Sequence, residues 1–109
     1  MNPGIGKSLK DVLITIKRVE TIVNAIADFS SVQKDITDVV ERKLLLLGSF
    51  MKDIDRKYPT LKISGKGKFI SLNYMLIHNH SAIENDEIWN VCKKDLPILR
   101  QEIELLLNP

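Results

Sequence analysis

The sequence has little cysteine, glycine, proline or aromatic residue, and it lacks long apolar runs. Its 109 residues include one Cys, five Gly, four Pro and 6% aromatic residues. The single Cys92 excludes an internal disulfide and fits a reducing compartment. No apolar run exceeds four residues, as at Leu44 to Leu47, whereas a membrane span needs roughly 18. The stretch before Lys10 has no apolar core of a secretion signal, so we expect a cytoplasmic chain without membrane contact.

Neither sign of charge dominates the chain. Sixteen Lys and Arg stand against fourteen Asp and Glu, which leaves a formal net charge of +2. This excess is too small to indicate nucleic-acid binding by itself, because phosphate binding needs basic residues gathered on one face. Hydrophobic residues make up 44% and charged residues 28%, an ordinary globular mixture. The length predicts a single domain over residues 1–109 with one core.

Apolar residues recur at steps of three and four, which is typical of amphipathic helices. A first stripe comprises Leu9, Leu13, Ile16, Val19, Val23 and Ile26. A second stripe, on a helix from about Asp35 to Lys57, comprises Ile36, Val39, Val40, Leu44, Leu47, Met51 and Ile54. Leu45 and Leu46 make the middle of this helix apolar on nearly all sides, so we expect it to be central or covered by a second subunit. Tyr58-Pro59 ends it, because proline disfavours helix in the preceding residue.

The connection from Thr60 to Lys68 contains Ser64-Gly65-Lys66-Gly67-Lys68 and is interpreted as a flexible surface loop. A phosphate-binding loop would need a preceding strand and Walker or Rossmann spacing, which are missing. The short apolar segment from Phe69 to His78 also suits a buried strand in length. However, the rest of the chain offers no partner strands, so helix is favoured.

A last helical segment begins near Glu84 and reaches Asp95-Leu96-Pro97. Asp95 is expected to cap a new helix with Pro97 in its first turn, which predicts a kink or break there. With short connections, these segments predict an all-α fold, an antiparallel four-helix bundle with a kinked or broken last helix at Pro97.

The segment that ends at His78 is similar to a signature of the HepT-like branch of the HEPN family. That signature reads Arg-Asn, three mostly apolar positions, His, any residue, Tyr, and it aligns with residues 73–80 here. Trp89 follows His78 by eleven residues and precedes Leu96-Pro97, as in the fourth helix of the family. The segment from Val40 to Gly48 and the Tyr58-Pro59 stop also resemble the family pattern. The resemblance covers residues 9–107.

The resemblance implies a concrete function. HepT-like proteins are bacterial and archaeal toxins that act as dimeric ribonucleases without a metal or other cofactor. Each is paired with a minimal nucleotidyltransferase as antitoxin. The Arg and His of the motif line a cleft at the dimer interface, and the Tyr two positions after the His receives AMP groups. The resemblance therefore implies a homodimer, a nucleotidyltransferase partner and RNA as substrate.

This chain departs from the family pattern at the chemical positions. His78 is retained, whereas Asn73 stands at the Arg position and His80 at the position of the modified Tyr. Family members often carry acidic residues in helix two where this chain has Leu45 and Ser49. The connection before Asn73 is also about three residues longer than in the family. Because His80 has no hydroxyl group, we expect no AMP transfer to it.

The departures leave two functional hypotheses open. Cleavage of RNA by such a site needs histidine for proton transfer and a fixed cation for the phosphate. Asn73 is neutral, which predicts a catalytically impaired relative that acts by binding. The alternative is an active ribonuclease that uses His78 with Lys66 or Lys68 as a substitute cation. A pure dimeric interaction module with no role on RNA is a further form of the binding hypothesis. Metal binding by His78 and His80 with Glu84 or Asp86 is disfavoured, since residues two apart on a helix point in different directions.

Overall fold

The computed structural model describes residues 3–28, 32–78 and 84–109, and over these ranges it contains helices and no strand. The all-α prediction is thereby confirmed. The elements in chain order are α1 (Pro3–Asn24), α2 (Lys34–Lys57), α3 (Lys66–His78), α4 (Asn85–Asn90), the π-helical turn η3 (Val91–Asp95) and α5 (Leu96–Leu107). None of the helices within these ranges has the length and apolar character required to cross a bilayer.

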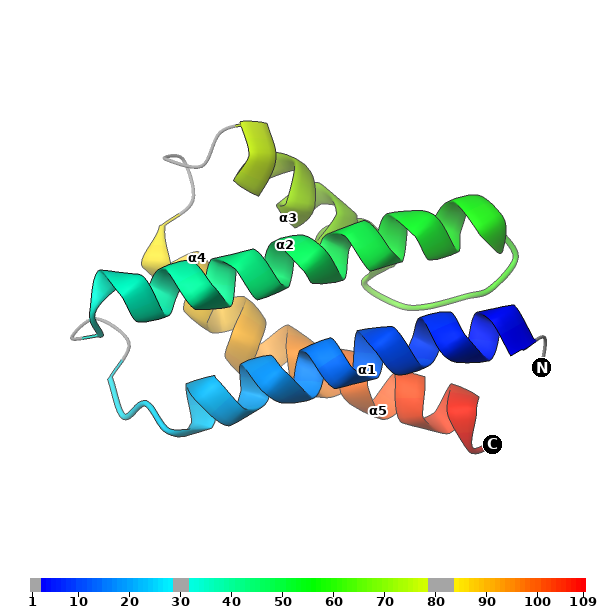
Figure 1. Cartoon of the computed structure of the whole chain (residues 1–109), viewed down its shortest axis with the longest axis horizontal. Coiled ribbons are helices and arrows are strands. Elements are labelled where there is room, and N and C mark those ends of the chain that lie inside the picture. Colours follow the sequence, from blue (N-terminus) through cyan, green and yellow to red (C-terminus); the bar gives the residue numbers. More distant parts are fainter. Residues whose placement is uncertain (1–2, 29–31, 79–83) are drawn as a thin grey trace.

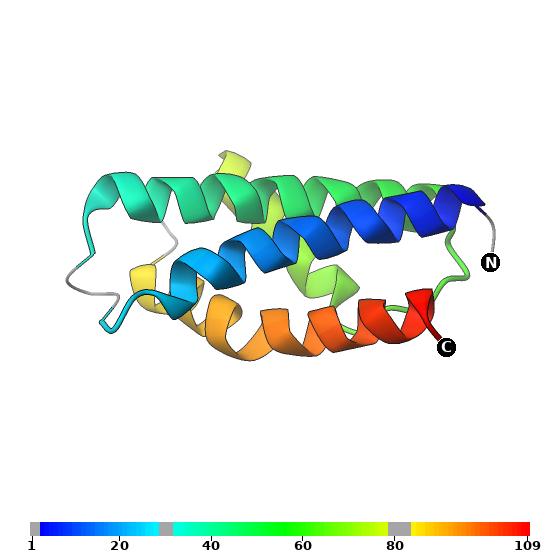
Figure 2. The same cartoon turned by 60° about the horizontal axis from the view of Figure 1, so that its bottom comes forward.

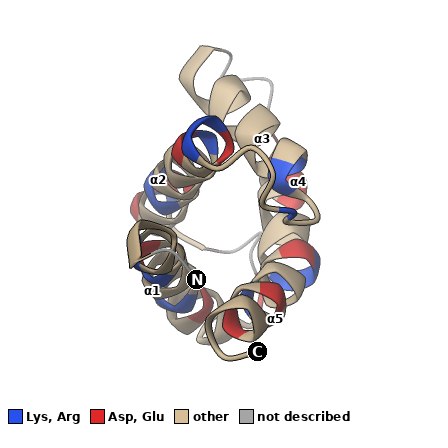
Figure 3. Cartoon of the chain, turned by 90° about the vertical axis from the view of Figure 1, so that its right-hand side faces the viewer, with Lys and Arg blue, Asp and Glu red and all other residues tan. Residues whose placement is uncertain are grey.

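The helices are arranged around one core. α1 lies beside α2 and beside α5, while α3 crosses α2 and extends past it with its C-terminal half (Figures 1 and 2). The beginning of α1 and the end of α5 lie at the same end of the molecule (Figure 1). Basic and acidic residues are interspersed around the outside, and the projecting half of α3 carries neither (Figure 3). No face gathers charge of one sign in this view.

The core draws buried apolar side chains from every long helix. They include Leu9, Val12, Ile16, Val19 and Val23 of α1, Val40, Leu44, Leu47, Met51 and Ile54 of α2, Phe69, Leu72 and Leu76 of α3, and Ile88, Cys92, Leu96, Leu99 and Ile103 of the last segment. The predicted stripes are therefore largely correct. Ile36 and Val39 are the exceptions, each 39% exposed. Ile36 lies in the first turn of α2, and Val39 points about 100° away from Val40, which faces the core.

α2 is the central helix of the fold, with α1 on one side and α3 on the other. Of the apolar run in its middle, Leu44 and Leu47 are buried, Leu45 is half-buried and Leu46 is 46% exposed. The other helices of the same chain therefore cover most of this run.

α2 and α3 cross at very close distance, because Gly48 has no side chain at the contact. A Cβ atom at position 48 would clash with Cβ of Asn73 and lie 2.8 Å from the carbonyl oxygen of Phe69. Only a residue without a side chain allows the two backbones to approach this closely. Gly48 thus sets how deeply α3 sits against α2.

α3 begins earlier than predicted, because Lys66, Gly67 and Lys68 are helical rather than part of the loop. Gly65 makes the preceding turn with a positive φ of 75°, a conformation that favours glycine, and the N–H of Phe69 then donates to the Gly65 carbonyl. Turning at Gly65 leaves the next residues free to start the helix. The connection is held in place, since the Ser64 N–H and hydroxyl both donate to Glu102 of α5.

Around Pro97 the chain stays helical, and the irregularity precedes the proline. α4, η3 and α5 follow one another without an intervening loop, and the N–H of Leu96 donates to the Val91 carbonyl with the wider π-helical spacing. Proline lacks an N–H and its ring crowds the carbonyl four residues earlier, so a wider turn accommodates it. The prediction that the Asp95 side chain caps the last helix is wrong. Asp95 has helical dihedral angles and makes no cap hydrogen bond; its carboxylate pairs with Lys68 at 2.8 Å.

The crossing yields a stability prediction with an internal control. Gly48→Ala should lower the free energy of unfolding by about 1–3 kcal/mol, because the added methyl group overpacks the contact with Asn73. Gly6→Ala, in α1, should instead raise it by about 0.5–1 kcal/mol, since nothing lies within 4 Å and alanine favours helix. Urea denaturation of both variants measures this. Equal effects of the two substitutions would contradict the close crossing.

Candidate functional site

Asn73, at the motif position, lies fully buried on the side of α3 that faces α2. Its amide nitrogen donates to the Leu45 carbonyl at 2.6 Å and lies 3.2 Å from the Ser49 hydroxyl. Its amide oxygen accepts a hydrogen bond from Nζ of Lys52 at 3.1 Å. The buried amide is thus paired at both ends, as buried polar groups require. Asn73 holds α3 to α2 and does not open into a cleft within this chain.

Asn73 contacts Leu45 and Ser49 of α2, two positions that were expected, from the resemblance, to differ from the HepT-like pattern. The backbone carbonyl of Leu45 and the hydroxyl of Ser49 both lie within hydrogen-bond distance of the Asn73 amide nitrogen. Leu45 contributes only its backbone carbonyl, which any residue would supply, so of these two residues only Ser49 takes part in the contact through its side chain.

His78 is the last residue of α3 and is exposed. Its ring lies 4.3 Å from the ring of Tyr74, one helical turn earlier, with the two planes tilted by 41°. Five residues of helix separate His78 from Asn73, which turns the two side chains about 140° apart around α3. One faces the α2 contact and the other the outside. A single chain does not bring them into one site.

Lys66 and Lys68 are not placed to assist His78 within one chain. They lie in the first turn of α3 and His78 lies at its end, about 15–18 Å away along the helix axis. Lys66 pairs with Asp55 at 2.8 Å, and Lys68 pairs with Asp95 at 2.8 Å. The predicted supply of a substitute cation by these lysines is therefore unsupported inside the subunit. His80 lies outside the described residues.

The cation nearest to the motif position is Lys52, which the sequence interpretation did not consider. It comes from α2, and its Nζ contacts the amide oxygen of Asn73. A sequence signal was present: Leu45, Ser49 and Lys52 recur at steps of four and three, which places them on one side of α2. Only the crossing of α3 over that side reveals their shared partner.

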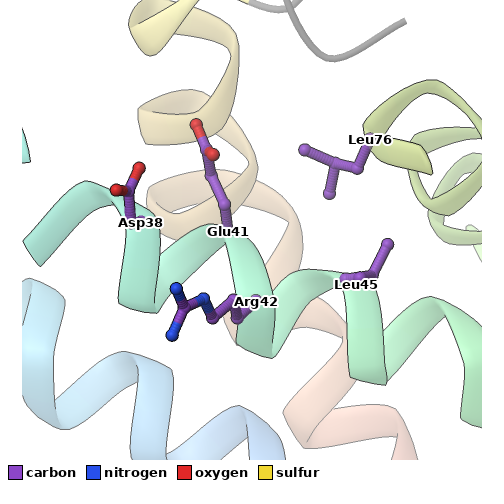
Figure 4. A pocket seen from close by; sticks show the side chains of 5 residues that line it. All are labelled: Asp38, Glu41, Arg42, Leu45 and Leu76. Atoms are coloured by element: carbon purple, nitrogen blue, oxygen red, sulfur yellow. The ribbon is translucent and has the colours of Figure 1, made fainter. Parts of the chain in front are cut away.

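A pocket of about 220 Å³ opens beside the crossing, between α2 and α3. It is lined by Asp38, Glu41, Arg42, Leu45 and Leu76. Figure 4 shows Asp38 and Glu41 on the same side of α2 and Arg42 turned away from them, toward α1. The two carboxylates repel a phosphate, so this pocket does not suit an RNA backbone. Within residues 3–28, 32–78 and 84–109, no three His, Cys, Asp or Glu side chains are grouped to bind a metal.

Cys92 is buried beside the core, as predicted for a structural thiol. Burial raises the pKa of its thiol to about 12, and the nearby Lys93 lowers it by less. Because the thiolate is the nucleophilic form, this thiol is inert at neutral pH.

Comparisons of this chain with known protein families, with curated proteins and with solved structures found no match.

The raised pKa of Cys92 predicts a pH dependence of stability. Above pH 9 the thiol ionises in the unfolded chain but stays protonated in the folded one until about pH 12. The folded state then binds more protons, so stability falls as pH rises, by roughly 1 kcal/mol per pH unit from this group. Below pH 9 the group contributes no slope.

Comparison with Cys92→Ala isolates this contribution, because other groups that titrate between pH 9 and 12 are common to both proteins. We expect the difference in unfolding free energy between them to be constant below pH 9 and to change above it. Urea denaturation across pH 7–10.5 provides the measurement. Parallel pH profiles throughout would contradict the burial of the thiol.

Proposed function

We propose that this chain is a HepT-like helical protein of a toxin–antitoxin type system, related to metal-independent ribonucleases but catalytically impaired, which acts by association. The observation that carries the proposal is the buried, fully paired Asn73 at the position of the family's arginine. A neutral amide inside a helix contact offers no charge to a phosphate. Loss of one such electrostatic donor costs on the order of 100- to 1,000-fold in rate.

The fold supports the resemblance in its general form. In this proposal α1, α2, α3 and the continuous α4–η3–α5 segment form an antiparallel four-helix bundle, and the last helix bends at the π-helical turn before Pro97. The contact of Asn73 with Leu45 and Ser49 is compatible with the resemblance, because three positions at which the chain was expected to differ from the family lie together. The cellular setting would be cytoplasmic, with a minimal nucleotidyltransferase as partner. A short nucleotidyltransferase reading frame beside this gene would support that pairing.

The outer side of α3 suits a homodimer. Ile70, Tyr74 and Ile77 recur at steps of four and three on the side of the helix turned away from Leu72 and Leu76. Tyr74 is 61% and Ile77 is 52% exposed, on the half of α3 that extends past α2 (Figure 1). An exposed apolar stripe on a projecting helix is typical of an interface. In the proposed dimer, a second copy covers this stripe.

A second candidate function is an active ribonuclease, and one contact favours it. Lys52 places an ammonium group next to Asn73, where the family has its guanidinium. In a dimer, a histidine of one subunit and this cation of the other would have to meet. The lysine is a point charge without the bidentate geometry of arginine, so it is a weaker substitute at a phosphate.

RNA cleavage distinguishes the two candidates. We expect the purified protein to give no cleavage above that of His78→Ala, since a proton-transfer group alone lacks a fixed cation for the phosphate. The measurement is cleavage of a mixed total-RNA substrate in EDTA. Robust cleavage that falls by 100-fold or more in both His78→Ala and Lys52→Met, but not in Lys57→Met, would establish the second candidate instead.

Asn73→Arg tests whether position 73 serves structure. Because its side chain packs against Gly48 in a buried contact, we expect arginine there to lower the free energy of unfolding by roughly 3 kcal/mol or more. Thermal denaturation followed by circular dichroism measures this. A variant as stable as the unaltered protein would mean that α2 and α3 separate easily at this point, which would remove the main support for the impaired function.

A charged residue introduced on the outer side of α3 tests the proposed dimer interface. Ile77→Lys should convert the dimer to a monomer, because burying an unpaired ammonium group is costly. Leu105→Lys, at a residue of α5 that is 68% exposed, is the matched control and should leave the dimer intact. Light scattering coupled to size-exclusion chromatography gives the mass. A monomeric unaltered protein at micromolar concentration would refute the dimer, and dissociation by Leu105→Lys alone would move the interface to α5.

A further inference from the structure

A second pocket, of about 360 Å³, lies between α3 and the α4–η3 segment. Its apolar floor is formed by Leu72 and Met75 of α3 with Val91 of η3, and the polar residues Ser71 and Asn90 also line it. Its rim carries three charged residues, Lys68 from α3 and Glu87 and Asp95 from the facing segment. The pocket is called the α3–η3 groove below.

The groove exists because α3 packs mainly on α2 and leaves its flank toward the last segment less closely covered. Glu87, Val91 and Asp95 recur at steps of four and thus line one side of α4 and η3. η3 lies along the groove, and a π-helical turn inside an α-helix is often found at functional sites. The groove and the π-helical turn are two separate features that coincide here.

The charges on the rim are unevenly distributed. Lys68 pairs with Asp95 at 2.8 Å and thereby neutralises one carboxylate at one end of the groove. Glu87, two turns of helix earlier, has no side-chain hydrogen bond or ion pair with any residue in the described ranges. The two carboxylates outnumber the one ammonium group, so the groove favours a cation and disfavours an anion.

From this arrangement we propose that the α3–η3 groove binds an alkylammonium group, with the ammonium on Glu87 and the methylenes over Leu72, Met75 and Val91. The apolar floor removes the alkyl chain from water, and Glu87 supplies the charge that selects an amine over an acid or alcohol of the same length. Methionine adapts its shape readily to such chains. Lys68 competes with such a ligand for Asp95, because its own ammonium group is paired with that carboxylate.

An alkylammonium group is present both in free alkyl amines and in the lysine side chain of a protein partner. The proposed binding is independent of the proposed ribonuclease relationship, since neither His78 nor Asn73 lines the groove. n-Hexylamine represents the first source and Nα-acetyl-lysine methylamide the second. n-Hexanol and hexanoate are the neutral and anionic references.

Titration of each probe into ¹⁵N-labelled full-length protein, followed by NMR at millimolar probe concentration, tests the proposal. We expect hexylamine to shift the signals of Leu72, Met75, Glu87 and Val91 in a saturable manner, and hexanoate to leave them unchanged. Glu87→Gln should weaken binding about two- to fivefold, the size typical of one solvent-accessible ion pair. Lys68→Met should tighten binding by a similar factor, because it releases Asp95 from its internal partner.

The opposite effects of these two substitutions separate a binding role from a structural one. Asp86→Asn is the matched control, since Asp86 lies beside Glu87 in the same first turn but does not line the groove. If Lys68→Met raises the affinity for hexanol as much as the affinity for hexylamine, the increase comes from apolar contact. The role assigned to Asp95 is then wrong. Binding of hexylamine alone assigns the site to free amines, and binding of the lysine amide assigns it to a protein partner. Saturable binding of neither probe, or equal binding of hexanoate, overturns the proposal.

Discussion

The packing of this protein depends on the contact between Gly48 and Asn73, where α2 and α3 come closest. The missing side chain at position 48 lets the two backbones approach, and the approach brings the Asn73 amide within reach of α2. A buried amide would be costly without partners, so its bonds to Leu45 and to Lys52 determine where along α2 the crossing occurs. The apolar contacts of Phe69, Leu72 and Leu76 provide attraction, but they are less selective in register.

The same contact explains why the motif residues do not form one site in a single chain. With Asn73 committed to α2, the regular geometry of α3 turns His78 toward the outside. A histidine in that position is accessible to another molecule but has no cation of its own helix beside it. Chemistry with RNA, as in the second candidate function, would have to be assembled with a second subunit.

Much of the fold could be predicted from residue spacing. The burial of Leu9, Ile16, Val40 and Leu44, the end of α2 at Tyr58 and the buried thiol of Cys92 all followed from local pattern. The errors share a cause, because each depended on what another part of the chain does. Gly65 makes the turn that ends the connection, so the residues from Lys66 onward are helical, and Asp95 pairs with Lys68 instead of capping a helix.

The candidate site was less predictable than the fold. The sequence identifies Asn73 and His78 as positions of interest. Whether their side chains point in the same direction depends on whether one helix includes both residues. Lys52 belongs to no sequence motif. It becomes relevant only because α3 crosses α2 near this residue. Contacts between helices that are distant in sequence are not contained in the periodicity of either helix.

The attachment of α3 has a consequence for the dynamics of the molecule. Because α3 packs mainly on α2, while α1 packs on α2 and on α5, the remaining helices keep their mutual contacts if α3 moves away. Polar connections resist such a movement at its N-terminal end, from Lys66 to Asp55 and from Lys68 to Asp95, and in its middle, where the Asn73 amide bonds to α2. The part of α3 beyond Asn73 is therefore held less firmly than its beginning, and we expect it to open locally at a lower free energy than global unfolding. Amide hydrogens in its projecting half would then exchange through this partial opening, while those of α1 and α2 would exchange only when the whole chain unfolds.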